Sequence, residues 1–163
     1  MPNIDKEDTI INWRTVGVKR ERKHEALISR LTMDSKGIFQ YLKDLMVFAA
    51  MVGHFYGDRK PLAGETIEII LDTYASDQKD GFIYLLGLME FKDGELLKDK
   101  RLKDSVSVFE EYCNAGLYVI ESWLDDNPGD PSGVDTLLQK IYERLAENEK
   151  EASVSNDDIE VLV

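Results

Sequence analysis

The sequence has only one cysteine and two histidines among its 163 residues. Cys113 has no second cysteine to pair with, which excludes an internal disulfide and a disulfide-stapled secreted scaffold. A zinc site needs several Cys or His ligands at fixed spacing, and His24 and His54 lie far apart in the chain. We therefore expect no metal, and we expect Cys113 to pack as a small apolar side chain on a helix seam.

Long apolar runs are missing as well. The longest uncharged stretch, from Leu45 to Phe55, has about half of the ~20 apolar residues that a membrane-spanning helix needs. The first residues, MPNIDKEDTI, lack the basic region followed by an apolar one that marks a secretion signal. These absences predict a cytoplasmic protein with no membrane partner.

Nucleotide-binding and catalytic motifs are absent too. The chain has neither the Lys-Ser/Thr of a P-loop after a run of glycines nor a G-x-G-x-x-G, so nothing predicts a phosphate-wrapping loop or a bound dinucleotide. Acid-x-Lys triplets begin at Glu21, Asp58 and Asp77 and are similar to a Mg²⁺-nuclease pattern, but none sits clearly in a strand paired with an upstream acid. With no catalytic residue and no cofactor to name, we predict that the protein is not an enzyme.

What the sequence does have is acid: 32 Asp and Glu against 20 Lys and Arg, for a net charge of −12. Such a surface does not dock on DNA as a whole, because phosphate contacts need Lys and Arg. The segment 18–24, VKRERKH, departs from this trend with four cations and one acid. It is either a solvated helix start or a candidate nucleic-acid patch. The residues of that patch are Lys19, Arg20, Arg22 and Lys23.

Hydrophobic periodicity predicts an all-α or predominantly α single domain, with about five helices around one buried central helix. A short β element is compatible with the β-branched residues at 9–18 or 66–71. We divide the chain into a partly loose lead-in (1–17), a helical domain (18–146) and an acidic, disordered tail (147–163).

Two predicted helices carry most of the apolar surface. The helix from Gly37 to His54 is apolar on every face between Leu45 and Val52, which is typical of a helix buried on all sides. The helix over 102–123 has apolar or small residues alternately four and three positions apart, a heptad seam about 34 Å long. Asn114 and Gly116 are poor helix formers in its middle, which indicates close packing of another helix or, as an alternative, a bound partner.

The segment GHFYGDRKPL follows the buried helix directly and is a candidate interaction loop. We expect it to be ordered, with at least one of the Phe55 and Tyr56 rings buried. Arg59 either pairs with an internal acid, such as Glu110 or Glu111, or presents a cation to a carboxylate or phosphate of a partner. The candidate residues of this loop are His54, Tyr56, Asp58, Arg59 and Lys60.

Two segments together resemble a known family. DLMVFAAMVGHFYGDRKPL, followed about fifty residues later by VFEEYCNAGLYVI, is similar to the Dnd system-associated protein four family. The first motif falls on Phe48, Ala49, Ala50, Gly53, Arg59, Pro61 and Leu62. The second falls on Phe109, Glu110, Glu111, Tyr112, Asn114, Gly116 and Leu117. The similar region runs from about Val18 to Leu145.

The resemblance implies a small accessory protein of a bacterial DNA phosphorothioation system, in a context of restriction and phage defence, and it implies no reaction. The functional prediction is a non-enzymatic accessory protein that contacts other proteins of the same defence system. Two alternatives remain: a nucleic-acid-binding module that uses residues 19–24, and a regulator whose acidic surface mimics DNA. The candidate residues from the second motif are Glu110, Glu111, Tyr112, Asn114 and Gly116.

Overall fold

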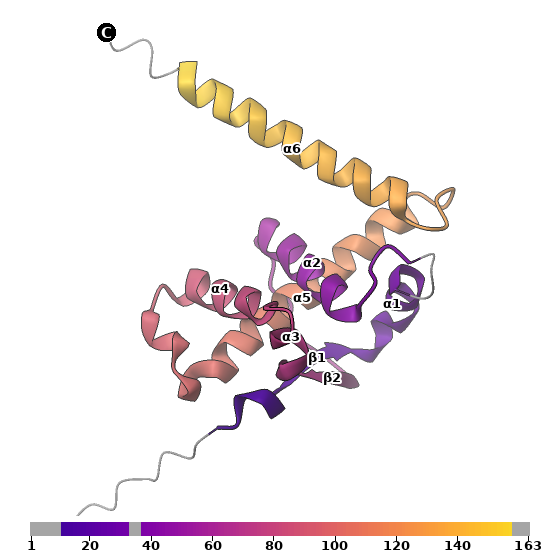
Figure 1. The fold of residues 1–163 in the computed structure, drawn as a ribbon. Coiled ribbons are helices and arrows are strands. Elements are labelled where there is room, and N and C mark those ends of the chain that lie inside the picture. The colour runs from indigo at the N-terminus through magenta and orange to yellow at the C-terminus, as the bar shows by residue number, and fades with distance from the viewer. Residues whose placement is uncertain (1–10, 33–36, 158–163) are drawn as a thin grey trace, which may run out of the picture.

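The computed structural model describes residues 11–32 and 37–157, with side chains described as far as residue 150. Within these residues the chain forms six α-helices and a two-stranded sheet, whose strands are separated in sequence by the first two helices (Figure 1). The elements are β1 (Gly17–Glu21), α1 (Glu25–Thr32), α2 (Leu42–Phe55), β2 (Thr66–Ile70), α3 (Leu71–Ala75), α4 (Asp80–Phe91), α5 (Leu102–Asp125) and α6 (Val134–Asp157). Short 3₁₀ turns lie at Trp13–Thr15, Arg22–His24, Gly94–Leu97 and Asp99–Arg101. The prediction of a predominantly α domain with a short β element is confirmed.

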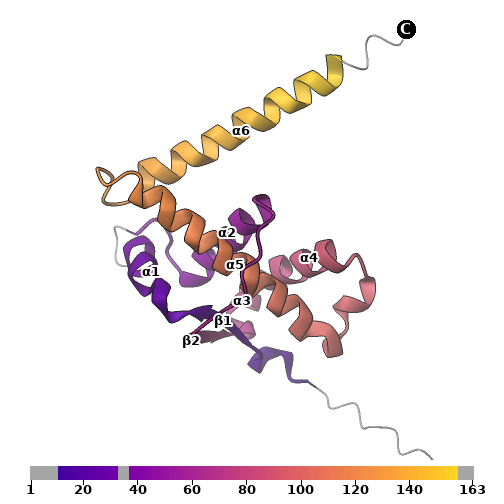
Figure 2. The same ribbon diagram turned by 180° about the vertical axis from the view of Figure 1, so that it is seen from behind.

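Helix α5 runs through the centre of the domain and packs against α2, α4, β1 and the start of α6 (Figures 1 and 2). Its seam residues from Leu102 to Ile120 are buried, as their alternating spacing predicts, and Trp123 at the end of the seam is half-buried. Helix α2 is also largely buried from Leu45 to Gly53, which confirms an interior position for the all-apolar segment. These two helices form the core on which the other elements rest.

The crossing of α2 and α5 depends on two glycines. A Cβ added to Gly116 would lie 1.8 Å from the carbonyl oxygen of Ala49, and one added to Gly53 would lie 2.0 Å from that of Tyr112. Neither distance is compatible with a side chain, so the two backbones touch directly. Close packing of another helix therefore explains why Gly116 occupies the middle of a long helix.

The strands pair antiparallel, with Gly17 opposite Ile70 and Glu21 opposite Thr66. The strand predicted at 66–71 is confirmed. The strand predicted over residues 9–18 is wrong in position: residues 13–15 form a 3₁₀ turn, and the strand begins at Gly17. The reason is the tertiary partner, because it is VKRE that lies alongside TIEII in register. Thr9 and Ile10 lie outside the described residues.

Helix α6 corrects the predicted boundary of the helical domain. Disorder was predicted from residue 147 onward, but the helix continues to Asp157. Good helix formers in this stretch and ion pairs one turn apart, such as Arg144 with Glu147, favour continuation. The helix leaves the body at an angle and extends beyond it (Figure 1). Within the described residues, no helix is long and apolar enough to cross a membrane.

Candidate functional site

Arg59 is held between α4 and α5 by two carboxylates. Its Nε and one terminal nitrogen lie 2.9 and 2.8 Å from Glu111 Oε2, and the other terminal nitrogen lies 2.5 Å from Glu90 Oε1. The Tyr112 hydroxyl donates to the second oxygen of Glu90 at 2.8 Å. Burial acts to lower the pKa of Arg59, but the hydrogen bonds that it donates to Glu90 and Glu111 raise this pKa overall. The ion pair with Glu111 joins the two sequence motifs into one structural unit.

The rest of the predicted interaction loop is more open. The His54 ring is half-buried and packs edge-on against Tyr112, with centroids 5.3 Å apart. Asp58 is exposed, and its backbone N–H closes the end of α2 by donating to the Gly53 carbonyl at 3.1 Å. Phe55 and Tyr56 are 52% and 40% exposed, so the prediction that one of these rings is buried is wrong. The rings lie beside α6, whose departure from the body leaves them uncovered.

Asn114 connects three segments of the chain from a buried position on α5. Its Oδ1 lies 3.0 Å from His24 Nε2. Its Nδ2 donates to Glu21 Oε1 at 3.2 Å and to the Lys60 carbonyl at 3.1 Å. An amide is suited to this position because it donates and accepts at once. The polar residue in the middle of the seam therefore fastens β1 and the loop onto the core.

Glu21 is the acid at the centre of this buried cluster. Its Oε1 accepts from the Ala63 N–H at 2.5 Å, and its other oxygen pairs with the Lys23 ammonium. Burial acts to raise the pKa of Glu21, but the bonds from Lys23, Ala63 and Asn114 lower it overall. The neighbouring His24 has its pKa lowered, chiefly by burial. The cluster is thus built around an ionised Glu21 and a neutral His24.

The basic segment divides between the interior and the surface. Arg20 is buried and donates to Glu25 Oε2 at 2.8 Å, while exposed Arg22 lies 3.1 Å from Glu65. The Lys23 ammonium lies 4.5 Å from the centre of the Tyr118 ring, and the Lys60 ammonium lies 3.9 Å from the same ring. Strand alternation accounts for the inward side chain of Arg20. The four cations therefore do not form one continuous patch.

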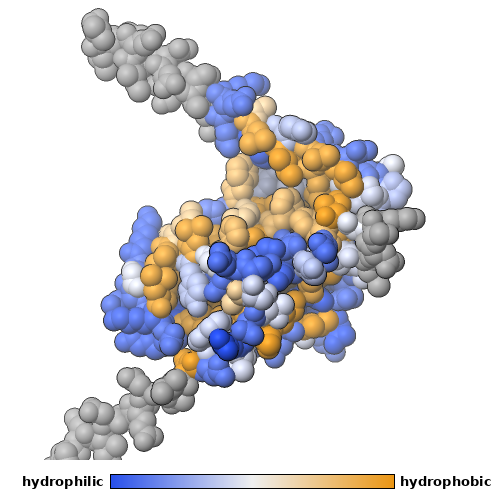
Figure 3. Space-filling view, in the orientation of Figure 1, coloured by the Kyte–Doolittle hydropathy of each residue, from blue (hydrophilic) through white to orange (hydrophobic). Residues whose placement is uncertain are grey.

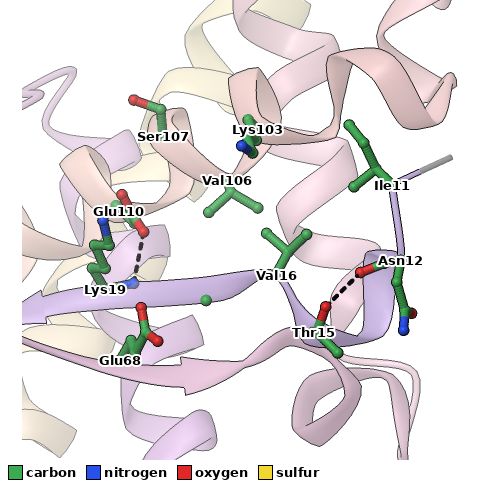
Figure 4. A pocket seen from close by; sticks show the side chains of 11 residues that line it. Ile11, Asn12, Thr15, Val16, Lys19, Glu68, Lys103, Val106, Ser107 and Glu110 are labelled. Carbon is green, nitrogen blue, oxygen red and sulfur yellow. Dashed lines mark hydrogen bonds between the residues drawn. The ribbon is translucent and has the colours of Figure 1, made fainter. Parts of the chain in front are cut away.

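A cavity with a volume of about 540 Å³ lies between β1 and the start of α5 (Figure 4). Ile11, Val16 and Val106 form its apolar part. Two lysines and two glutamates supply its charged groups: Lys19, Lys103, Glu68 and Glu110. The Lys19 backbone N–H donates to Glu110 Oε1 at 2.6 Å, and burial raises the pKa of Glu110. The balanced charges of this cavity favour neither an anion nor a cation.

Catalytic and metal-binding chemistry finds little support in the described part of the chain. No group of three or more His, Cys, Asp and Glu side chains there is placed to hold a metal ion. Cys113 is buried, with its sulfur 3.5 Å from Met46 Sδ, and burial raises the pKa of its thiol. A neutral buried thiol is a poor nucleophile. Cys113 therefore has the packing role that its position on the seam predicts.

A comparison with protein families places this geometry in context. The family model of DNA sulphur modification system-associated protein 4 matches residues 17–158. The chain belongs to this family. The match begins at the first residue of β1 and ends one residue beyond α6, so it includes every strand and α-helix described above. No curated protein and no solved structure matches the chain.

As a member of this family, the chain carries both motifs on which the resemblance rested, and the structure gives them a common location. Four residues at this location were not among the candidate site residues: Glu21, His24, Glu90 and Tyr118. Glu21 carried one signal, since it is the only acid in a run of four cations. Glu90 and Tyr118 carried none, because only the packing of α4 and of the loop on α5 brings them to Arg59 and Lys60.

Proposed function

We propose that this protein is a non-enzymatic, cytoplasmic accessory component of a DNA sulphur-modification system, and that it acts in restriction and phage defence by binding other proteins of that system. Membership of the family supports the association with the system. The absence of a catalytic group in the described residues is compatible with a binding role. The observation that carries the proposal of protein contacts is the surface of α4.

Helix α4 has the composition of a buried helix but is covered on one side only. It has no charged residue from Gly81 to Met89. A helix that is apolar all round is normally buried on all sides. Here Ile83, Leu86 and Gly87 are buried on the face that packs against α5 and the 3₁₀ turn at Gly94–Leu97, whereas the large side chains of the opposite face are partly exposed.

The exposed face of α4 presents a row of large side chains at helical spacing. Phe82, Leu85 and Met89 are 38%, 48% and 46% exposed. Figure 3 shows hydrophobic side chains gathered over this helix. Contiguous exposed apolar surface of this kind marks protein-binding sites, and phenylalanine and methionine are enriched in them. A protein partner that covers this face would restore to α4 the environment its sequence specifies.

The test is co-purification from cells that express the complete set of proteins of the system. Tagged wild-type protein is expected to retain at least one of them, and Leu85→Glu is expected to lose it, because a charge in the centre of the face must be desolvated. Tyr142→Glu, on the distant α6, is the matched control and is expected to keep the partner. Retention of no protein of the system by the wild type would refute the proposal.

Nucleic-acid binding is the second candidate, and the contact that favours it is the meeting of Lys23 and Lys60 at Tyr118. An aromatic ring flanked by ammonium groups is suited to a base and its phosphates. Arg20, Arg22 and Lys23 are already paired with carboxylates, which weakens this candidate. A mobility-shift assay with duplex, nicked and phosphorothioated DNA decides it: genuine binding falls steeply between low and physiological salt.

The third hypothesis, a DNA mimic, is a regulator whose acidic surface occupies the basic groove of a partner. It differs from the α4 proposal in the surface used and in its dependence on salt. Competition between this protein and DNA for a restriction subunit would support it, and Leu85→Glu is expected to leave such competition unchanged.

A further inference from the structure

The cavity between β1 and α5 has the size of a small-molecule site. Its volume of about 540 Å³ lies within the range of about 300–1,000 Å³ that such sites occupy. Four segments supply its walls: residues 11–16, β1, β2 and the first half of α5. Figure 4 shows side chains from these segments around one hollow. A ligand in this hollow would touch parts of the chain that only the fold brings together.

The backbone of Gly17 supplies a hydrogen-bond donor and an acceptor to this cavity. The Val16 carbonyl accepts from the Leu71 N–H at 2.8 Å, so the even-numbered residues of β1 direct their backbone groups toward β2. The odd-numbered residues direct theirs toward α5, as the bond from the Lys19 N–H to Glu110 shows. Gly17 lines the cavity and has no side chain, so its backbone is what the cavity exposes. Its N–H and C=O have no hydrogen-bond partner among the described residues.

Gly17 also makes room for the carboxylate of Glu68. A Cβ at position 17 would lie 2.3 Å from Glu68 Oε2, so a side chain there would displace this carboxylate. Glu68 belongs to β2 but reaches the cavity that lies beside β1 (Figure 4). Its carboxylate makes no hydrogen bond and no ion pair with any residue that the structure describes. The absence of a side chain at Gly17 thus places an unpaired acid in the cavity.

The other charged groups of the cavity are not paired with each other at contact distance. Lys19 and Lys103 form no ion pair within the described residues. Glu110 accepts the backbone bond from Lys19 and has no ion-pair partner there. Burial raises the pKa of Glu110, and the nearby charge of Glu68 adds to the increase. The two acids therefore repel each other, and a cation between them would relieve that repulsion.

The presence of both signs of charge selects the kind of ligand. An anion would leave the two carboxylates without a cation, and a cation would leave the two ammonium groups without an acid. An uncharged ligand would remove charges from water without compensation, which is costly. A zwitterion satisfies both signs. In an α-amino acid, the ammonium and the carboxylate lie side by side, as do the C=O and the N–H of Gly17 that would receive them.

We propose that the cavity binds an α-amino acid with an apolar side chain, its carboxylate at Lys103 and the Gly17 N–H, and its ammonium at Glu68 and the Gly17 C=O. The apolar side chain of the ligand lies on the surface that Ile11, Val16 and Val106 form. The proposal uses no residue of the exposed α4 face and does not depend on the role proposed for that face.

The first test is an NMR titration of the isotope-labelled full chain with leucine, valine and methionine. Two analogues of leucine that each lack one charge are the matched ligands: isocaproate keeps the carboxylate, and isoamylamine keeps the ammonium. The amino acid is expected to bind at least about tenfold more tightly than either analogue, because each analogue loses charge-assisted hydrogen bonds. The largest shift changes are expected in residues 11–19 and 103–110.

The second test separates the two ends of the ligand. Glu68→Gln is expected to abolish the preference for leucine over isocaproate, and Lys103→Met the preference over isoamylamine. Gly17→Ala is expected to act like Glu68→Gln, because the new Cβ displaces the flexible end of Glu68. Lys100→Met, on the exposed turn before α5, is the matched control and is expected to keep the wild-type affinities. Glu68 and Lys103 are exposed, so circular dichroism is expected to show unchanged folding.

Three results would overturn the proposal: no response to any of the three amino acids up to about 10 mM, a concentration that detects even millimolar affinity; leucine binding that Glu68→Gln and Lys103→Met leave unchanged; or shift changes confined to residues away from the cavity. Leu85→Glu on α4 is expected to leave leucine binding unchanged. Failure of the α4 proposal in co-purification therefore leaves this inference intact, and failure to bind amino acids leaves the α4 proposal intact.

Discussion

Arg59 and Glu111 are 52 residues apart in sequence, and two guanidinium nitrogens lie 2.9 and 2.8 Å from a single carboxylate oxygen of Glu111. Together with Glu90, this pair fastens the loop after α2 to α4 and α5. Arg59 is the residue that most resembles a binding residue in the sequence, and in the structure its ion pairs connect parts of the fold.

Substitution Arg59→Ala is expected to lower the free energy of unfolding by about 1–3 kcal/mol, because it leaves Glu111 and Glu90 without their partner. Urea denaturation measures the change. Lys60→Ala in the same loop is the control: its ammonium lies against the Tyr118 ring, so we expect a loss below about 1 kcal/mol. Equal effects of the two substitutions would contradict a structural role for Arg59.

Gly116→Ala is expected to be the most damaging single methyl addition in the chain. The new Cβ would lie 1.8 Å from the Ala49 carbonyl oxygen, so α2 and α5 must separate. A loss of roughly 3 kcal/mol or more is expected from overpacking at a backbone contact. Gly81→Ala in α4 meets no atom within 4 Å and serves as the control. Its thermal unfolding midpoint is expected to stay level or rise.

His24 is expected to make stability depend on pH. Its pKa in the folded protein is lowered, mainly by burial, from its usual value of 6.5. The unfolded chain therefore binds a proton more readily than the folded one, and stability falls as the pH is reduced below about 6.5. Chemical denaturation at pH 7.5, 6.5 and 5.5 measures the slope. His24→Gln is expected to flatten it, and an unchanged slope would assign the effect to another group.

Asp130 is expected to control the start of α6. Its carboxylate accepts from the Thr136 N–H at 2.9 Å and the Gly133 N–H at 3.0 Å, and these bonds lower its pKa to about 2. A lowered pKa means that its stabilising effect is present at neutral pH and is lost as the pH falls from about 3.8 through 2. Asp130→Ala is expected to reduce the melting temperature at pH 7. Ser132→Ala is expected to reduce it less, because it removes only the bond from the Val134 N–H and the one that the Ser132 hydroxyl donates to Asp130.

Sequence periodicity predicted the helices well where burial is one-sided or complete. The seam of α5, the interior position of α2 and the packing role of Cys113 follow from residue spacing, because a helix puts every third or fourth side chain on one face. The start of α6 depends on two side chains of the turn before it. Ser132 does accept from the Val134 N–H, but Asp130 makes the shorter bonds.

The sequence by itself determined a predominantly α domain with α2 and α5 at its core, and it carried the family motifs. Only the tertiary structure decided which acid holds Arg59, that Glu21 and His24 meet Asn114, and that the Phe55 and Tyr56 rings remain uncovered. The reason is physical: local spacing fixes which face of an element is apolar, whereas ion pairs and open grooves depend on how distant elements cross. The direct contact between Gly53 and Gly116 sets that crossing for α2 and α5.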